Sequence, residues 1–264
     1  MVVLITGISS GFGLETARLL AEEGHTVYGT VRHAVEPLPK VHYLQVDVRD
    51  KQAVADVVRQ VVEKEGRIDV LINNAGMGIG GPLEFATEEE IRLQMDTNFM
   101  GLVHCVDAVL PYMRQQKSGK IIALSSIGGL MGLPYQGFYS ASKFAIEGYC
   151  EALRLEVKSF GIQVVVLRPG DFATGFTGSR KKVTDEAALE AYPIYKTAIE
   201  KVEHDENCGL KPVVLAKKIS KIIKKQHPRH GYVVASLEQK LSVFLKRILP
   251  AKWFARILGS YYRV

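Results

Sequence analysis

Three side chains near the middle of the chain could carry out acid–base chemistry: the hydroxyl of Ser126, the phenol of Tyr139 and the ammonium of Lys143. Apolar residues recur at helical spacing from Phe138 to Ser159, so Tyr139 and Lys143 should lie one turn apart on one helix face. Lowering a tyrosine pKa from about 10 to about 7 requires about 4 kcal/mol. One positive charge about 4 Å away, at an effective dielectric of about 20, supplies roughly that much. We therefore expect Lys143 to lower the pKa of Tyr139.

The pair alone is ambiguous, because a tyrosine and a lysine at this spacing also occur on ordinary amphipathic helices, where one packs and the other is solvated. The segment before Tyr139 favours a catalytic role for the pair. An apolar run at Ile121–Leu124 predicts a buried strand before Ser126, and the glycines and proline of residues 128–134 predict an irregular loop. Ser126 would then follow the carboxyl end of a strand, where open α/β sheets bind ligands.

The N-terminal residues predict a strand, a glycine-rich turn and a helix, in that order. Val2–Ile5 is the strand, and Gly7, Gly11 and Gly13 lie in the turn. Such a turn lets the backbone approach a phosphate, and the helix N-terminus offers free N–H groups and a positive dipole end. The spacing departs from Gly-x-Gly-x-x-Gly, and a connection without a ligand is the alternative. We favour dinucleotide binding.

The end of the second predicted strand, residues 25–31, bears on which dinucleotide binds. In dinucleotide folds an acid near this point holds the adenine ribose of NAD, whereas an arginine accommodates the 2′-phosphate of NADP. Here the strand is followed by Arg32, and the first acid after it is Glu36. We therefore expect NADP(H), with NAD(H) as the alternative in which Arg32 is simply exposed.

Three more predicted strands are followed by polar or glycine-rich segments: residues 41–46 by Asp47, 69–72 by Asn73–Gly76, and 162–167 by 168–174. With a last strand at 231–235 and the helical patterns between, they predict an α/β fold. We expect a Rossmann-like, doubly wound parallel sheet of about seven strands with helices on both faces. These polar and glycine-rich segments would then lie together in the crevice at the carboxyl ends of the strands, where such sheets bind ligands. A helix at 91–113 also carries Asn98, a buried amide that needs partners.

We expect one domain over residues 1–264 with two special regions. Residues 175–210 lack strand character and mix charges with tyrosines, which favours one or two mobile helices forming a substrate lid. Residues 237–264 interleave large apolar side chains with cations and predict an amphipathic C-terminal helical extension. The extension could cap the cavity, pack against a second subunit or lie on an anionic membrane, and we favour the packing roles.

Composition argues against several classes of function. The chain has 264 residues, 47% of them hydrophobic, and a formal net charge of +6. No nucleic-acid motif accompanies this charge, and the seven histidines and three cysteines show no convincing metal-ligand pattern. No apolar run is long enough to span a membrane. The isolated cysteines and the absence of a leader-like N-terminus lead us to expect a cytoplasmic protein without a metal.

Together, these motifs resemble the short-chain dehydrogenase/reductase family over residues 1–235, and the basic aromatic tail resembles branches acting on steroids, retinoids or other lipids. The resemblance implies that Tyr139 exchanges a proton with the substrate oxygen and that Ser126 hydrogen-bonds this oxygen. Lys143 would lower the tyrosine pKa and bind the nicotinamide ribose, and Asn98 would hold a water in a proton relay. The implied catalytic set is thus Asn98, Ser126, Tyr139 and Lys143.

The resemblance also implies a set of cofactor contacts, in which Asp47 meets adenine, Asn74 the ribose region and Thr174 the nicotinamide amide. The full set is Gly7, Ser9, Ser10, Gly11, Phe12, Gly13, Arg32, Asp47, Val48, Asn74, Ala75, Gly76, Tyr139, Lys143, Pro169, Gly170 and Thr174.

The implied activity is hydride transfer with NADP(H) between a ketone or aldehyde and an alcohol, on a small and hydrophobic substrate. The implied assembly is a homodimer or homotetramer formed through the helices that hold Asn98 and Tyr139. Three alternatives stay open: a non-catalytic dinucleotide-binding regulator, an NAD-preferring dehydrogenase of a small alcohol, and an epimerase or dehydratase that retains its cofactor.

Overall fold

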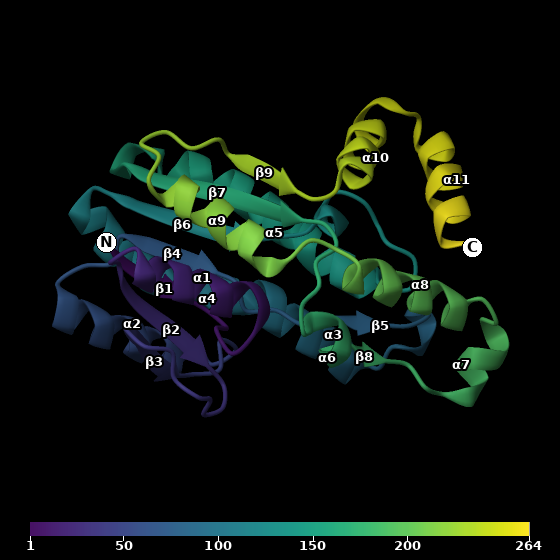
Figure 1. Ribbon diagram of the computed structural model, residues 1–264, viewed down its shortest axis with the longest axis horizontal. Helices are drawn as coiled ribbons and strands as arrows, with labels where there is room; N and C mark the ends of the chain where they lie inside the picture. The colour runs from purple at the N-terminus through teal and green to yellow at the C-terminus, as the bar shows by residue number, and fades with distance from the viewer. Residues whose placement is uncertain (264) are drawn as a thin grey trace.

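A computed structural model describes residues 1–263 (Figure 1). Its main sheet has seven strands, all parallel, in the order β3-β2-β1-β4-β6-β7-β9. They are β1 (Val2–Ile5), β2 (Thr26–Val31), β3 (Val41–Gln45), β4 (Val70–Asn73), β6 (Gly119–Leu124), β7 (Ile162–Pro169) and β9 (Gly231–Val234). The order in which strands are added to the sheet reverses between β1 and β4. In sheets of this kind, ligands bind in the crevice outside the carboxyl ends of these two strands. The predicted doubly wound fold is confirmed.

Helices cover both faces of the sheet because each carries one apolar stripe. One face holds α1 (Gly11–Glu22) and α9 (Pro212–Ile223), and the other holds α2 (Lys51–Glu65), α4 (Gly101–Gln116) and α5 (Gly137–Glu156). Side chains alternate between the faces along each strand. In β1, Val2 and Leu4 join the cluster under α2, α4 and α5, while Val3 and Ile5 join the cluster under α1 and α9.

The helix expected at 91–113 is in fact two helices, α3 (Glu88–Met95) and α4, joined by a π-helical turn at Asp96–Met100. Such a turn inserts one residue without interrupting the apolar stripe, so periodicity alone did not reveal it. Three short 3₁₀ helices lie in the connections of this part of the chain: η1 (Leu83–Phe85), η3 (Ile127–Gly129) and η4 (Lys158–Phe160).

The region expected to form a lid contains three helices, α6 (Phe176–Ser179), α7 (Glu186–Ala191) and α8 (Tyr195–Asn207). It also contains a strand that the sequence did not predict, β8 (Lys181–Lys182), which pairs in parallel with β5 (Ile79–Gly80). A two-residue strand leaves no pattern in the sequence, because its pairing depends on β5 approaching from a distant part of the chain.

The C-terminal extension is a pair of helices, α10 (Leu237–Ile248) and α11 (Ala251–Tyr262). Ser236 begins α10 with a capping box in which its side chain accepts from the Gln239 N–H. The two helices form a hairpin that stands beyond the carboxyl end of β9 and above α8 (Figure 1). No helix within residues 1–263 combines the length and apolarity needed to cross a bilayer.

Candidate active site

A cavity of about 520 Å³ lies at the carboxyl ends of the strands, and most of the predicted site residues line it. They are Gly7, Ser9, Ser10, Gly11, Phe12, Arg32, Asp47, Val48, Asn74, Ala75, Gly76, Ser126, Tyr139, Lys143, Pro169, Gly170 and Thr174. Two predicted residues, Gly13 and Asn98, lie outside this wall. The doubly wound topology thus brings segments from most of the chain to one cavity.

The glycine-rich turn is shaped for a close ligand approach. Gly7 has φ +71°, in the left-handed region that favours glycine. A Cβ at Gly13 would lie 2.1 Å from the Gly7 carbonyl oxygen, so Gly13 allows the helix to pack against the turn. Within the described residues the Ser10 side chain makes no capping bond to α1, and no acid occupies the first turn of this helix. The first N–H groups of α1 therefore suit the pyrophosphate of a dinucleotide.

The crevice between β1 and β4 is fixed by four hydrogen bonds. Thr6 Oγ1 accepts from the N–H groups of Asn74 (2.9 Å) and Ala75 (3.0 Å). Asn74 Nδ2 donates to the carbonyl oxygens of Thr6 (2.9 Å) and Gly7 (2.7 Å). The Asn74 amide nitrogen therefore holds the glycine-rich turn in place, a role that the motif alone did not reveal.

One end of the cavity, where we expect the adenosine of the cofactor, carries Arg32 after β2 and Asp47 after β3. Asp47 accepts two hydrogen bonds on Oδ1 and Oδ2 from Arg49 Nε, and a shorter one of 2.6 Å from Arg49 Nη2. The hydrogen bond from Arg49, aided by the charge of Arg32, holds the pKa of Asp47 below its ordinary value. This end of the cavity therefore combines a fixed carboxylate with a cation suited to a phosphate.

Tyr139 and Lys143 project from the first two turns of α5 toward Ser126, which follows β6. Ser126 caps the turn η3, where its Oγ accepts from the Gly128 N–H at 3.0 Å. A Cβ at Gly128 would lie 3.4 Å from both Ser126 Oγ and Tyr139 Cε1. The serine and the tyrosine are therefore neighbours, and glycine at position 128 gives them room.

The electrostatics of this group differ from our expectation that Lys143 lowers the pKa of Tyr139. Burial raises the pKa of Tyr139 to about 12, and a hydrogen bond with Ser126 acts in the opposite direction. Burial also lowers the pKa of Lys143 to about 8. Lys143 Nζ donates to the Leu124 carbonyl oxygen (2.9 Å) and lies 5.7 Å from the Tyr139 ring centroid. Desolvation therefore dominates the pKa of Tyr139, Lys143 is not among the groups that shift it, and the phenol is neutral at physiological pH.

Asn98 lies in the π-helical turn and is only 2% exposed. Its Oδ1 accepts from the Met77 N–H (2.8 Å), and its Nδ2 donates to the Met77 carbonyl oxygen (3.0 Å) and to Ser142 Oγ (3.0 Å). Asn98 thus ties the loop after β4 to α5, on which Tyr139 and Lys143 stand. The implied water relay remains a prediction.

The opposite wall of the cavity comes from the lid, the hairpin and the segment after β7, so residues of the C-terminal extension cap the cavity, one of the roles expected for it. Its carboxylates are Asp171, Asp205, Glu206 and Glu238, and its apolar residues include Val202, Leu241, Leu245, Phe254, Ile257 and Leu258. These residues form no motif and come from separate segments of the chain. Only the placement of α8, α10 and α11 brings them together.

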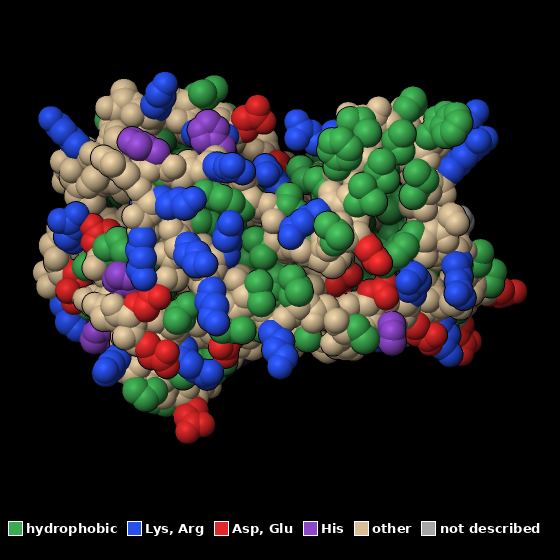
Figure 2. All heavy atoms as spheres, turned by 45° about the horizontal axis from the view of Figure 1, so that its top comes forward, with side chains coloured by type: hydrophobic (Ala, Val, Ile, Leu, Met, Phe, Trp, Pro, Cys, Tyr) green, Lys and Arg blue, Asp and Glu red, His purple; other side chains and the backbone are tan. Residues whose placement is uncertain are grey.

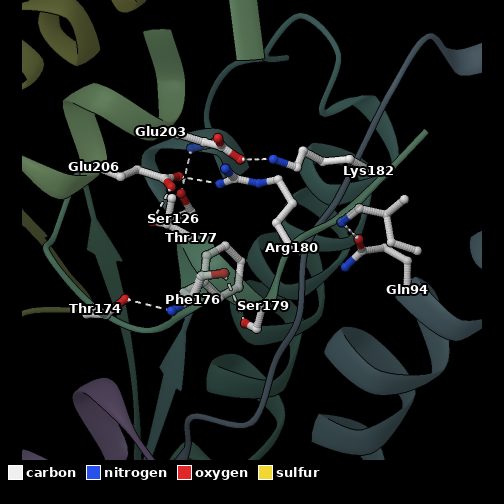
Figure 3. A network of polar contacts seen from close by, with 12 residues as sticks. Gln94, Ser126, Thr174, Phe176, Thr177, Ser179, Arg180, Lys182, Glu203 and Glu206 are labelled. Atoms are coloured by element: carbon white, nitrogen blue, oxygen red, sulfur yellow. Dashed lines mark hydrogen bonds and ion pairs between the residues drawn. The ribbon is translucent and has the colours of Figure 1, made fainter. Parts of the chain in front are cut away.

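The carboxylates of this wall are held in defined positions. Burial, followed by the charges of Glu206 and Asp205, raises the pKa of Asp171 to about 6. Glu206 accepts from Thr177 Oγ1 (2.6 Å) and pairs with Arg180. Figure 3 shows Arg180 and Thr177 directed toward Glu206. A hydrogen bond with Gln239 and the charge of Arg180 only partly offset the effect of burial on Asp171.

The hairpin is joined to the lid by a contact that we call the α8–α11 clasp. The Tyr261 hydroxyl donates to Asp205 Oδ2 (2.7 Å), and Lys201 Nζ lies 3.0 Å from the same oxygen. Lys201 Nζ also lies 4.2 Å from the Tyr261 ring centroid. A second contact joins α10 to the β7 segment, because Gln239 Oε1 accepts from the Asp171 N–H (3.2 Å).

The geometry of the cavity agrees with comparisons to known proteins. Residues 1–185 match the family model described as short chain dehydrogenase. The chain belongs to the short-chain dehydrogenase family. It is 49% identical over 264 residues to a 3-ketodihydrosphingosine reductase of Bacteroides thetaiotaomicron, covering 100% of this chain and 98% of that protein. It is 38% identical over 211 residues to human 17-beta-hydroxysteroid dehydrogenase type 1, covering 72% of this chain and 64% of that protein.

Solved structures show the same fold. A short-chain dehydrogenase from Streptomyces avermitilis has a TM-score of 0.81 at 27% identity, covering 99% of this chain and 96% of that one. ElxO with NADP bound has a TM-score of 0.70 at 25% identity, covering 88% and 95%. A Burkholderia phymatum enzyme in complex with NAD has a TM-score of 0.79 at 23% identity, covering 92% of each chain.

This short-chain dehydrogenase is therefore an oxidoreductase that uses a nicotinamide dinucleotide and acts on a small molecule. Within residues 1–263, no group of three or more His, Cys, Asp and Glu residues is arranged to hold a metal ion.

Proposed function

We propose that this short-chain dehydrogenase reduces the ketone of a hydrophobic, amine-bearing substrate with NADPH. One observation carries the proposal. A single cavity joins the Ser126, Tyr139 and Lys143 group to a wall that combines many apolar side chains with several carboxylates. The alcohol product would be the substrate of the reverse reaction, so the enzyme interconverts a ketone and an alcohol.

The cofactor is assigned from the residues at the sheet edge. The glycine-rich turn and the N-terminus of α1 would hold the pyrophosphate, and Arg32 would bind the 2′-phosphate that distinguishes NADP from NAD. The charge of Lys143 would hold the nicotinamide ribose. When bound, the nicotinamide supplies the hydride.

The chain's own residues then manage the proton. Ser126 Oγ accepts from the Gly128 N–H, and its hydroxyl, which hydrogen-bonds Tyr139 in this structure, would donate to the substrate oxygen when substrate is bound. Tyr139 also donates to this oxygen and transfers its proton as negative charge develops there. The neutral phenol is a stronger acid than the alcohol that forms, so protonation is favourable. A raised tyrosine pKa therefore suits reduction better than oxidation.

The substrate class is proposed from the second wall. The Bacteroides thetaiotaomicron relative is named for reduction of 3-ketodihydrosphingosine, a long-chain ketone with an amine beside the carbonyl. Asp171 lines the same cavity as Ser126, Tyr139 and Lys143. Asp171 would bind the ammonium, and residues such as Leu245 and Phe254 would pack along the alkyl chain.

We also propose that the enzyme is cytoplasmic and pairs through α5. An exposed free thiol at Cys208 suits a reducing compartment. Five small or apolar residues follow one another at helical spacing along the exposed face of α5: Ala141, Phe144, Gly148, Ala152 and Leu155. A stripe of this kind is typical of a helix that packs against a second copy.

The test is an assay of NADPH oxidation, followed at the NADPH absorbance. We expect turnover of 3-ketodihydrosphingosine, faster with NADPH than with NADH, and weaker turnover of a ketone of equal length without the amine. Absence of NADPH consumption with every ketone tested would favour the alternative of a non-catalytic dinucleotide-binding regulator. Conversion of substrate without net consumption would favour an epimerase or dehydratase.

A further inference from the structure

The hairpin of α10 and α11 has two faces with different surroundings. Its inner face lines the cavity through Leu245, Phe254 and Leu258. What we call the apolar hairpin face consists of large side chains that are 46% to 83% exposed: Leu237, Leu241, Phe244, Ile248, Trp253, Ile257 and Tyr261. Figure 2 shows these hydrophobic side chains gathered in one area of the surface, with Lys and Arg side chains around them.

The charges on the hairpin are almost all positive. Residues 237–263 hold one acid, Glu238, and six cations: Lys240, Lys246, Arg247, Lys252, Arg256 and Arg263. Arg247, Lys252 and Arg256 are exposed and lie at or near the connection between the two helices. A surface that pairs large apolar side chains with cations is complementary to an anionic lipid surface, where acyl chains lie beneath phosphate groups.

We propose that the apolar hairpin face docks on an anionic lipid bilayer. In this position the exposed aromatic and aliphatic side chains enter the headgroup region, and the cations contact the lipid phosphates. A second copy of the chain is a poorer occupant, since it would bring the same excess of cations against this one. The uncharged stripe on α5 offers the second copy a better surface.

The position of the hairpin relative to the cavity suggests what docking on a bilayer would do for the enzyme. Leu241, Ile257 and Tyr261 belong both to the apolar hairpin face and to the cavity wall. The cavity therefore reaches the surface that would lie on the bilayer. A lipid-like ketone could pass from the bilayer into the cavity without crossing water, which would remove the cost of exposing its alkyl chain.

The first test uses the single tryptophan of the chain, Trp253, which is 63% exposed. Wild-type protein is mixed with vesicles of phosphatidylcholine alone or of phosphatidylcholine with phosphatidylglycerol. With the anionic vesicles we expect a blue shift of the Trp253 emission and co-sedimentation of the protein. We expect affinity to fall about tenfold in high salt and binding to the neutral vesicles to be weak.

Two pairs of variants locate the contact. Arg247→Glu combined with Lys252→Glu should weaken binding to anionic vesicles at least about tenfold. Lys217→Glu combined with Lys221→Glu, on exposed positions of α9, makes the same charge change elsewhere and should retain binding. Phe244→Ser combined with Ile248→Ser should also weaken binding, whereas Leu155→Ser on α5 should not. NADPH binding by every variant verifies that it is folded.

Three results would overturn the proposal: no association of wild type with anionic vesicles, equal binding by the hairpin variants, or equal loss in the α9 control. A Trp253 blue shift without vesicles that grows with protein concentration, together with a larger particle in light scattering, would instead assign the face to a second copy. Because none of these readouts measures turnover, they stand or fall separately from the proposed reductase activity.

Discussion

The two halves of the cavity are built in different ways. The half proposed to hold the cofactor, which we call the cofactor half, consists of short segments at the carboxyl ends of strands, joined by hydrogen bonds to the backbone, as where Asn74 Nδ2 donates to the Thr6 and Gly7 carbonyl oxygens. The substrate half consists of side chains from surface helices joined by side-chain contacts, as where Tyr261 meets Asp205. Sheet topology therefore sets the first half and helix packing sets the second. The chemistry and the substrate selectivity of this enzyme should respond to different substitutions.

The largest expected effect separates chemistry from binding within the cofactor half. Tyr139→Phe removes the proposed proton donor but keeps the ring, so kcat should fall about 10³-fold. NADPH affinity, measured by fluorescence titration, should stay within about twofold of wild type. Tyr149→Phe on the same helix packs against Phe99 and should leave kcat nearly unchanged. Near-normal turnover by Tyr139→Phe would show that another group supplies the proton.

A smaller effect is expected at the adenosine end. Arg32→Ala should weaken NADPH binding about 10-fold to 100-fold, because a charged contact to the 2′-phosphate is lost. NADH lacks this phosphate, so its affinity should change little. Arg18→Ala, on the exposed face of α1 beside Glu15, serves as a control for a general change in charge. Equal losses of NADPH and NADH on titration would rule out the phosphate contact.

The smallest effect probes the substrate half alone. Asp171→Asn should raise KM for the amino ketone about tenfold, because one charged contact to the ammonium is lost. A ketone of equal length without the amine should keep its KM, and NADPH affinity should be unaffected. If both ketones lose equally, Asp171 shapes the cavity and does not recognise the amine.

The same residue predicts a pH dependence. The pKa of Asp171 is raised to about 6, so its carboxylate is charged above that value and takes up a proton as pH falls through it. KM for the amino ketone should therefore rise below about pH 6 in wild type, and this rise should be absent in Asp171→Asn. A profile that is identical in the two proteins would assign the titration to another group.

The fold and the cofactor half could be predicted because their signals are local. The glycine-rich turn, the Asn-Asn-Ala-Gly segment and the four-residue spacing of Tyr139 and Lys143 each lie within one strand end or one helical turn. Contacts between segments far apart in the chain could not be predicted from the sequence. Spacing could not show that Lys143 Nζ turns to the Leu124 carbonyl, nor that Asp171 and Asp205 share one wall. Such features depend on how the helices pack on the sheet and against one another.

The α8–α11 clasp joins the hairpin to the roof of the cavity. Tyr261 is bonded to Asp205, and the next residue, Glu206, holds Thr177 and Arg180 at the end of α6. A tilt of the hairpin would be transmitted along this linkage to the lid. Turnover would then depend on whether the hairpin is docked on a bilayer as well as on the substrate concentration.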